Sequence, residues 1–197
     1  MQNQLEQLAK LFLKFPGIGQ RQAKRFAYFI LTQPESYART LAQALTTARS
    51  LSATCSKCLR IYEGTNGVCS ICSDTSRDSS ALLVVEKSQD IESLLQTDYR
   101  GLFFVLGGLI PIVQKTVLGD TNIALLKERI AKESAQPYEV ILAFPVTPNG
   151  EHTDSVVREM LAAYPVSITS LGRGLSTGAE LEYADLASLN ASLKKRE

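Results

Sequence analysis

Four cysteines form two identical pairs within a short part of this 197-residue chain. Cys55 and Cys58 make the first pair, Cys69 and Cys72 make the second, and ten residues lie between the pairs. Each C-x2-C pair can turn two sulfur atoms towards one point. This spacing is typical of a site in which four thiolates surround one tetrahedral zinc ion.

Redox or disulfide pairing is the alternative use of these cysteines. Two matching pairs without a spare cysteine favour the metal, and the residues after Met1 lack the basic region and apolar run of a secretory signal. We therefore predict one structural zinc ion per chain, with Gly64 and Gly67 allowing the second pair to fold back on the first. Because sulfur fills all four positions, the metal has no open position for a substrate, and its role is to fold a segment too small to be stable alone.

A turn with the pattern hydrophobic-Pro-Gly-Ile-Gly is the second candidate site. Gly17 and Gly19 remove side chains where the next helix begins, so its unpaired N–H groups and positive dipole end can touch a phosphate. Arg21 and Arg25 follow on one helical face, with Lys24 beside them. We predict that these residues grip a DNA or RNA backbone without reading bases. An ordinary corner, in which the glycines only close the turn, is the alternative.

The first 52 residues contain three stretches with hydrophobic residues at helical spacing. The pattern predicts one helix over about residues 3–15, a second that ends near Pro34, and a third over about residues 37–51. This region has seven basic and two acidic residues, whereas residues 79–197 have eleven basic and fifteen acidic residues. The asymmetry predicts that any contact with a polyanion is made by the first fifty residues.

Short apolar runs alternate with helical patterns after the cysteines. We expect strands at residues 81–85, 101–106, 140–143 and 166–171, with helices near 91–95, 123–130 and 156–161 between them. This alternation predicts a parallel sheet covered on both faces. A last helix follows Asp185, which could cap it, and Lys194 to Arg196 lie at its carboxyl end.

Sites in open α/β sheets gather beyond the carboxyl ends of the strands, which points to Glu86 and to the loop that contains Glu151. Magnesium-assisted phosphoryl chemistry needs two or more converging carboxylates, and no Asp-x-Asp pair follows the third strand. We expect Glu151 to be a favourable charge at a helix N-terminus. His152, the only histidine, is expected on the surface, and the glycine-rich loops are expected to be turns.

The order of these parts resembles the bacterial recombination mediator family RecR over essentially the whole chain. The segment Gly178 to Asp185 is the most specific carrier of the resemblance. The other carriers are Pro16 to Gly19 with Arg21 and Arg25, the four cysteines, Arg77-Asp78, Val84 to Glu86, Val105 to Gly108 and Glu139 to Ala143.

The resemblance implies an α/β multi-module protein with four parts. These are a helix-hairpin-helix bundle over residues 1–52, a four-cysteine zinc finger over 53–78, a Toprim-like parallel α/β domain over 79–172 and a C-terminal helical extension over 173–197. It also implies a non-enzymatic homo-oligomeric clamp around DNA that partners RecO and RecF. Such a clamp helps to load the strand-exchange protein RecA at gaps coated by single-strand-binding protein.

The chain departs from the family pattern at residues 110–115, at Ser176 and at Phe103-Phe104. These changes bear on partner contacts and loop geometry more than on DNA binding. Few phosphate contacts per chain imply weak, salt-sensitive binding, so we expect a dimer or tetramer. No apolar run reaches the length of about 20 residues that a membrane span needs, and we expect a cytoplasmic, nucleoid-associated bacterial protein.

Two other functions remain open from the sequence. One is a magnesium-dependent Toprim-type nuclease or topoisomerase-like enzyme, whose metal would lie near Glu86. The other is a zinc-containing adaptor that binds only proteins, with the turn at Gly17 as a structural corner. DNA cleavage with magnesium would favour the first, and absence of DNA binding at low salt would favour the second.

Overall fold

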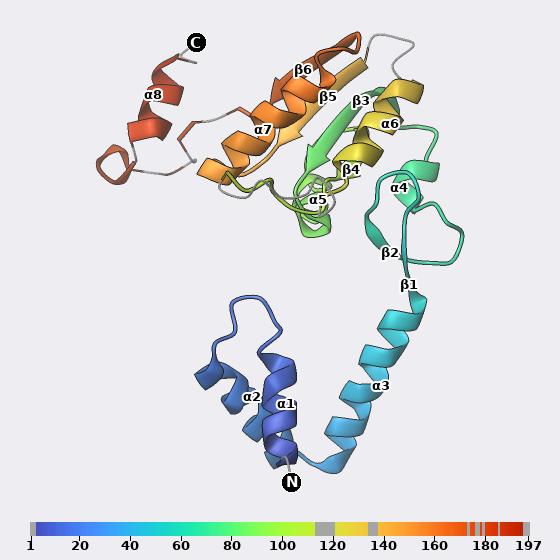
Figure 1. Cartoon of the computed structure of the whole chain (residues 1–197), viewed down its shortest axis with the longest axis vertical. Coiled ribbons are helices and arrows are strands. Elements are labelled where there is room, and N and C mark those ends of the chain that lie inside the picture. The colour runs from blue at the N-terminus through green and yellow to red at the C-terminus, as the bar shows by residue number, and fades with distance from the viewer. Residues whose placement is uncertain are drawn as a thin grey trace. The chain divides into compact units, whose positions relative to one another are not determined.

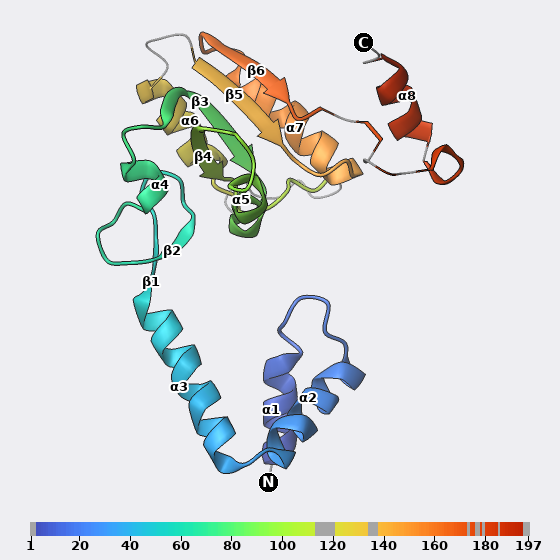
Figure 2. The same ribbon diagram turned by 180° about the vertical axis from the view of Figure 1, so that it is seen from behind.

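The computed structural model describes residues 3–112, 121–133, 138–172, 174–175, 178, 180–184 and 186–194. The chain divides into two compact units, Met1–Ser52 and Ala53–Glu197, and each is described by itself. Figures 1 and 2 show the ribbon from two opposite sides.

The first unit consists of the helices α1 (Gln4–Phe12), α2 (Gln20–Thr32) and α3 (Glu35–Leu51), as the hydrophobic spacing predicts. Asn3 begins α1, because its side chain accepts a hydrogen bond from the Leu5 N–H at 3.2 Å. The helices α1 and α2 pack on small buried side chains, which let their backbones approach closely. These side chains belong to Ala9, Ala23 and Ala27.

The apolar face predicted for α3 forms, but the first unit does not bury it. None of the residues of α3 is buried, and Leu45 is 62% exposed. The ring of Tyr37 on α3 contacts the ring of Phe29 on α2. The two ring centroids lie 6.1 Å apart in an edge-to-face arrangement. The helix is therefore amphipathic in sequence without a partner for its apolar side in the described part of this unit.

The second unit contains a parallel sheet of β3 (Asp78–Val85), β4 (Gly101–Val105), β5 (Tyr138–Ala143) and β6 (Val166–Ser170). The strands lie in the order β4-β3-β5-β6, which can be followed in Figures 1 and 2. The register pairs Leu83 with Phe103 on one side and with Ile141 on the other. The predicted parallel α/β arrangement is therefore confirmed.

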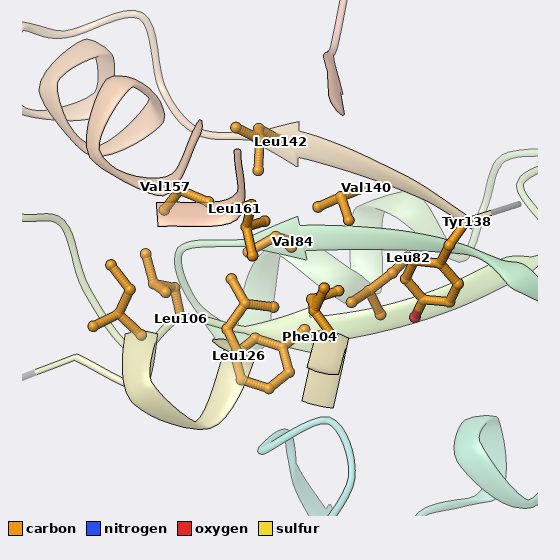
Figure 3. Packing of buried hydrophobic residues seen from close by; sticks show 12 residues of the cluster. Leu82, Val84, Phe104, Leu106, Leu126, Tyr138, Val140, Leu142, Val157 and Leu161 are labelled. Atoms are coloured by element: carbon orange, nitrogen blue, oxygen red, sulfur yellow. The ribbon is translucent and has the colours of Figure 1, made fainter. Parts of the chain in front are cut away.

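One face of the sheet packs against α6 (Ile123–Glu133) and α7 (Pro148–Leu161). Figure 3 shows strand residues such as Leu82 and Phe104 grouped with Leu126 of α6 and with Val157 and Leu161 of α7. The helix α7 begins earlier than the sequence predicts. Thr147 caps it, since the Thr147 hydroxyl accepts a hydrogen bond from the Gly150 N–H at 3.1 Å.

The opposite face of the sheet is covered by α5 (Ser88–Leu94) and by the cysteine-containing segment. That segment forms β1 (Ser52–Thr54), β2 (Ile61–Glu63) and the one-turn helix α4 (Ser70–Ser73), none of which the sequence predicts. Phe103 and Phe104 are both fully buried, on opposite faces, because successive residues of a strand point in opposite directions. The two phenylalanines that depart from the family pattern thus serve the two halves of the core.

The C-terminal residues form a 3-10 turn (Leu181–Tyr183) and the helix α8 (Leu186–Lys194). The Leu175 N–H donates a hydrogen bond to the Ser192 hydroxyl at 3.0 Å and so connects α8 to the preceding segment. Asp185, the predicted cap, and Lys195 and Arg196 lie outside the described residues, as do residues 113–115 of the departing segment at 110–115. No helix in the described part of the chain is long and apolar enough to cross a membrane.

Candidate metal centre and nucleic-acid interface

The structure brings the four cysteine sulfurs together, as the spacing predicts. The sulfur atoms of Cys55, Cys58, Cys69 and Cys72 all lie within 4.8 Å of one another, and those of Cys58 and Cys69 are 3.6 Å apart. A tetrahedral zinc with Zn–S bonds of about 2.3 Å separates its sulfur ligands by about 3.8 Å. A disulfide has a bond of about 2.0 Å, and all four thiols are free. The site therefore fits one four-coordinate metal ion and is compatible with zinc.

The backbone holds each cysteine pair in a tight turn. The Cys55 N–H donates to the Arg60 carbonyl and the Leu59 N–H donates to the Cys55 carbonyl, both at 2.9 Å. Leu59 has a φ of 61°, a conformation that costs a branched side chain more than it would cost glycine. Gly67 has a φ of 73°, and its carbonyl accepts a hydrogen bond from the Ser56 N–H at 2.8 Å. The second pair thus folds back on the first.

The cysteine cluster is part of the sheet's core and not a free-standing finger. Cys55, Cys58 and Cys69 have no exposed surface and pack in one apolar cluster with the strand residues of this face. The Val105 N–H donates to the Cys58 carbonyl at 2.8 Å, so the first turn also covers the edge of β4. The sequence does not predict this contact, because it joins segments that are far apart along the chain.

The thiols influence one another strongly because they are buried together. A hydrogen bond from the Cys72 side chain is the main reason why the pKa of Cys58 is lowered to about 5. The same hydrogen bond, followed by burial, raises the pKa of Cys72 above its ordinary value. A divalent ion bound by the four sulfurs would displace the thiol protons, so metal binding would release protons.

Two arginines lie against this cluster, and the sequence analysis did not single out either of them. Arg60 forms an ion pair with Glu92 at 3.5 Å. Arg129 of α6 is only 7% exposed, and its Nη1 donates to the carbonyls of Lys57 and Phe103, both at 3.1 Å. The Nη2 of Arg129 is buried without a hydrogen-bond partner in the described structure, a state that typically costs about 1–3 kcal/mol.

One sequence signal could have identified Arg129. The buried face of α6 contains Ile123, Leu126 and Ile130, and Arg129 lies at a buried position of that same helix. A charged residue inside an apolar helical face is unusual unless it is paired. The sequence alone does not reveal its partners, which come from the first cysteine turn and from β4.

The predicted phosphate-binding turn is exposed to solvent. Gly17, Gly19, Arg21, Lys24 and Arg25 all lie on the surface of the first unit. Gly17 has a φ of 75°, which favours glycine, whereas Gly19 has an ordinary φ of −86° and forms the N-cap of α2. A Cβ atom at either glycine would meet no atom within 4 Å. The shape of the turn thus explains the glycine at position 17 but not the glycine at position 19.

The basic side chains after the turn are available to a ligand. Arg25 Nη1 makes a long hydrogen bond of 3.4 Å to Gln22 Oε1 on the same helix. None of the ion pairs formed by the described residues involves Arg21, Lys24 or Arg25. The first turn of α2 also contains no acidic residue, so its positive dipole end is not neutralised from within the helix. This arrangement suits the binding of an anion such as a phosphate.

The two carboxylates considered for magnesium have other surroundings. Glu86 forms an ion pair with Lys87 Nζ at 2.9 Å, and Glu151 lies in the first turn of α7. Among the described residues, the four cysteines are the one group of three or more potential ligands that could hold a metal. His152, which we expected on the surface, is half-buried on α7.

The family models that match the chain cover the helical hairpin and the sheet. Residues 5–49 match the family described as RecR, helix-hairpin-helix, and residues 80–172 match the Toprim domain family. The recombination protein RecR of Porphyromonas gingivalis is 38% identical over 193 residues, which cover 98% of this chain and 91% of that protein. The RecR of Pediococcus pentosaceus is 38% identical over 97% of this chain and 96% of its own length. With a hairpin bundle, a four-cysteine cluster and a Toprim sheet in one order over nearly the full length, the chain belongs to the RecR family of recombination proteins.

Proposed function

We propose that this protein is a recombination mediator in DNA repair that grips the DNA backbone through the turn between α1 and α2. The observation that carries the proposal is the exposed turn from Gly17 to Arg25, with uncapped amides and three basic side chains outside any ion pair of the described residues. Contacts of this kind go to phosphates and carry no sequence information. We therefore expect binding to unrelated DNA sequences with similar affinity.

Gly19 supports this proposal because the fold does not require a glycine there. Its backbone conformation is open to other residues, and space surrounds its Cα. A residue without a side chain is needed at such a position when a ligand approaches the backbone closely. A phosphate at the N-terminus of α2 would be such a ligand.

The metal in the cysteine cluster is proposed to be zinc, one ion per chain. Four sulfur ligands with no open position are typical of structural zinc sites. The zinc would fasten the cysteine segment to one face of the sheet, and no chemical step would involve it. We keep the division into residues 1–52, 53–78, 79–172 and 173–197 as part of this proposal.

The protein is proposed to act as a homo-oligomer, a dimer or tetramer, with RecO and RecF as partners at gaps in DNA. Several apolar side chains of the first unit are more than half exposed, and where such side chains form a contiguous patch they mark a surface that binds another protein. They include Tyr28, Phe29, Leu31 and Leu45. An oligomer would also join several weak backbone contacts into useful affinity. We propose a cytoplasmic, nucleoid-associated location for this assembly.

We also propose that the protein is not an enzyme. The pairing of Glu86 with Lys87, and the absence of a carboxylate cluster from the described residues, support this view over a magnesium-dependent nuclease. The Toprim sheet would then be a scaffold and partner surface.

The test is a double substitution, Arg21→Ala with Arg25→Ala, in the full-length protein. Loss of two phosphate contacts should weaken binding to unrelated DNA sequences alike. It should also lower the slope of log affinity against log salt by about 1.8 for duplex DNA or about 1.4 for single strands. Fluorescence anisotropy with labelled oligonucleotides over a salt series measures both quantities.

The matched control is Arg39→Ala with Arg49→Ala. These arginines lie on α3 of the same unit and are also exposed, so the change in net charge is identical. The control should retain most of the affinity. If the two double variants lose affinity equally, or if the first binds DNA like the wild type, the turn is not the DNA-binding element.

A further inference from the structure

Arg129 is the only charged side chain that is buried among the described residues. It belongs to α6, which covers the face of the sheet opposite to the cysteines. Its side chain nevertheless contacts residues outside the layer formed by α6 and α7. Its guanidinium reaches the edge of β4 and the first cysteine turn. A buried cation is costly unless negative or hydrogen-bonding groups compensate for its burial, and the groups around Arg129 show what compensates here.

The hydrogen bonds of Arg129 join three elements at one point. Nε donates to Glu133 Oε2 at 2.9 Å, one turn along α6. Nη1 donates at 3.1 Å both to Phe103 O of β4 and to Lys57 O, which lies between the first two cysteines. The Lys57 contact spans 72 residues of sequence. The guanidinium therefore fixes the position of the first cysteine turn against the sheet.

The Nη2 nitrogen of Arg129 takes part in none of these hydrogen bonds. This nitrogen is buried and lacks an acceptor among the described residues. Burial acts to lower the pKa of Arg129, but the hydrogen bond and charge of Glu133, followed by Tyr138 and Cys72, raise it above its ordinary value. The contact with the Lys57 carbonyl places the guanidinium against the backbone turn that carries Cys55 and Cys58.

The charge of the metal centre explains why a cation is useful there. Four thiolates around one divalent zinc carry a net charge of about −2. Glu133 pairs with Nε of Arg129, and Nη2 on the other side of the guanidinium is left without an acceptor among the described residues. A cation that holds the backbone of the first cysteine turn, with one donor still unused, suits the surroundings of such an anionic centre.

We propose that Arg129 is the outer-sphere residue of the zinc centre. It positions the Cys55–Cys58 turn through the Lys57 carbonyl and joins that turn to β4 and α6, so that the turn is held ready to bind the metal. This inference rests on the proposed binding of zinc. It assigns Arg129 a role in metal retention and none in DNA contact.

The test measures metal retention in the full-length, zinc-loaded protein. Arg129→Ala should raise the zinc dissociation constant about 10- to 100-fold and speed the transfer of zinc to a chromogenic chelator, as is usual for loss of an outer-sphere partner. Arg129→Lys keeps the charge but not the fork of donors, so it should recover part of the loss. Replacement of zinc by cobalt should also reveal shifted sulfur-to-cobalt absorption bands in both variants.

The matched control is Arg158→Ala. Arg158 of α7 makes the same kind of contacts, an ion pair with Asp154 four residues before it and a hydrogen bond of 3.0 Å to the Ile168 carbonyl of β6. It does not belong to the cysteine cluster. Its loss should affect folding stability but should leave zinc transfer and the cobalt spectrum unchanged.

The outcomes separate this inference from the proposed function. A wild-type protein that binds no zinc overturns both. A wild-type protein that holds zinc, with Arg129→Ala, Arg129→Lys and Arg158→Ala releasing it equally slowly, overturns only the role of Arg129. If Arg129→Ala does not fold, Arg129→Lys decides: faster zinc release than in Arg158→Ala supports the role, and equal release overturns it.

Discussion

The two units of this chain use their apolar residues in opposite ways. The first unit buries only small side chains, those of Ala9, Ala23 and Ala27, and exposes large ones such as Phe29 and Leu45. The second unit buries large side chains on both faces of its sheet and encloses three of the four cysteines completely. The helical unit therefore leaves large apolar side chains on its surface, whereas the sheet unit packs its large apolar side chains in a core.

This difference separates the two candidate sites by mechanism. The turn at Gly17 can bind a ligand only because it leaves amides and basic side chains exposed and leaves space around Gly19. The cysteine cluster depends on what surrounds it, namely the strand residues and Arg129. Substitution of the exposed basic side chains of the first unit should thus affect ligand binding without loss of stability, whereas substitutions in the cysteine cluster should affect stability together with metal binding.

The largest effect is expected from loss of the metal. Cys69→Ser removes one buried ligand, and the remaining three sulfurs should hold zinc poorly. Because the cluster is part of the sheet's core, we expect a melting temperature lower by at least about 10 °C, which corresponds to about 3–5 kcal/mol. Differential scanning calorimetry and metal analysis measure the two effects.

The control for this prediction is Ser56→Ala, an exposed residue of the same turn that offers no ligand to the cluster. It should keep its zinc and melt close to the wild type. Limited proteolysis of Cys69→Ser should first cut within residues 53–78. Cuts in both units at the same temperature would contradict the separation of the units.

A smaller effect is expected from the two glycines of the turn, which should respond differently. Gly17→Ala places a side chain in a left-handed conformation and should destabilise the first unit by about 1–2 kcal/mol. Gly19→Ser should not destabilise it, since serine is a good N-cap. The serine hydroxyl would, however, take the amide that a phosphate needs, so DNA affinity should fall. Thermal denaturation and anisotropy measure the two properties.

This pair also tests the surface character of the turn. If Gly19→Ser binds DNA like the wild type while Gly17→Ala loses both stability and affinity, the glycines serve only to close the corner. The phosphate would then not be bound at the amide that Gly19 leaves open, and another part of the unit would make the contact with DNA.

The smallest effect is expected from Glu86→Gln. Glu86 forms an ion pair with Lys87 in the described structure, and its loss should change neither DNA affinity nor zinc content. Neither the wild type nor the variant should nick supercoiled DNA in the presence of magnesium, as agarose gels will show. Nicking by the wild type that disappears in Glu86→Gln would indicate an enzyme and would contradict the scaffold role of the sheet.

Most of the fold could be predicted because its signals are local. The helical spacing of Leu5, Leu8 and Phe12 and the apolar run from Ala81 to Val85 reveal their elements without knowledge of distant residues. The start of α7 was missed because Pro148 and Asn149 add no apolar residue to the periodic pattern, although Thr147 and Pro148 are a typical helix start.

The sites were predictable to different degrees. The spacing of the cysteines determines a four-sulfur site, because two turns of this kind close on one ion. The spacing does not indicate that Cys58 is hydrogen-bonded through its carbonyl to Val105, or that Arg129 lies against the cluster. The spacing of apolar residues also does not predict that His152 is half-buried, because its burial depends on how α7 lies on the sheet.

The kinds of helix and strand and their order follow from the sequence alone, because the spacing of apolar residues is a signal over a few positions. The same holds for the four cysteines as potential metal ligands and for the basic turn, whose residues lie close together in the chain. The cover that the cysteine segment forms on one face of the sheet, and the contacts of Arg129 with β4 and the first cysteine turn, depend on the tertiary structure. Such contacts join residues far apart along the chain. They depend on which apolar faces meet when the whole unit closes, and no local pattern encodes that choice.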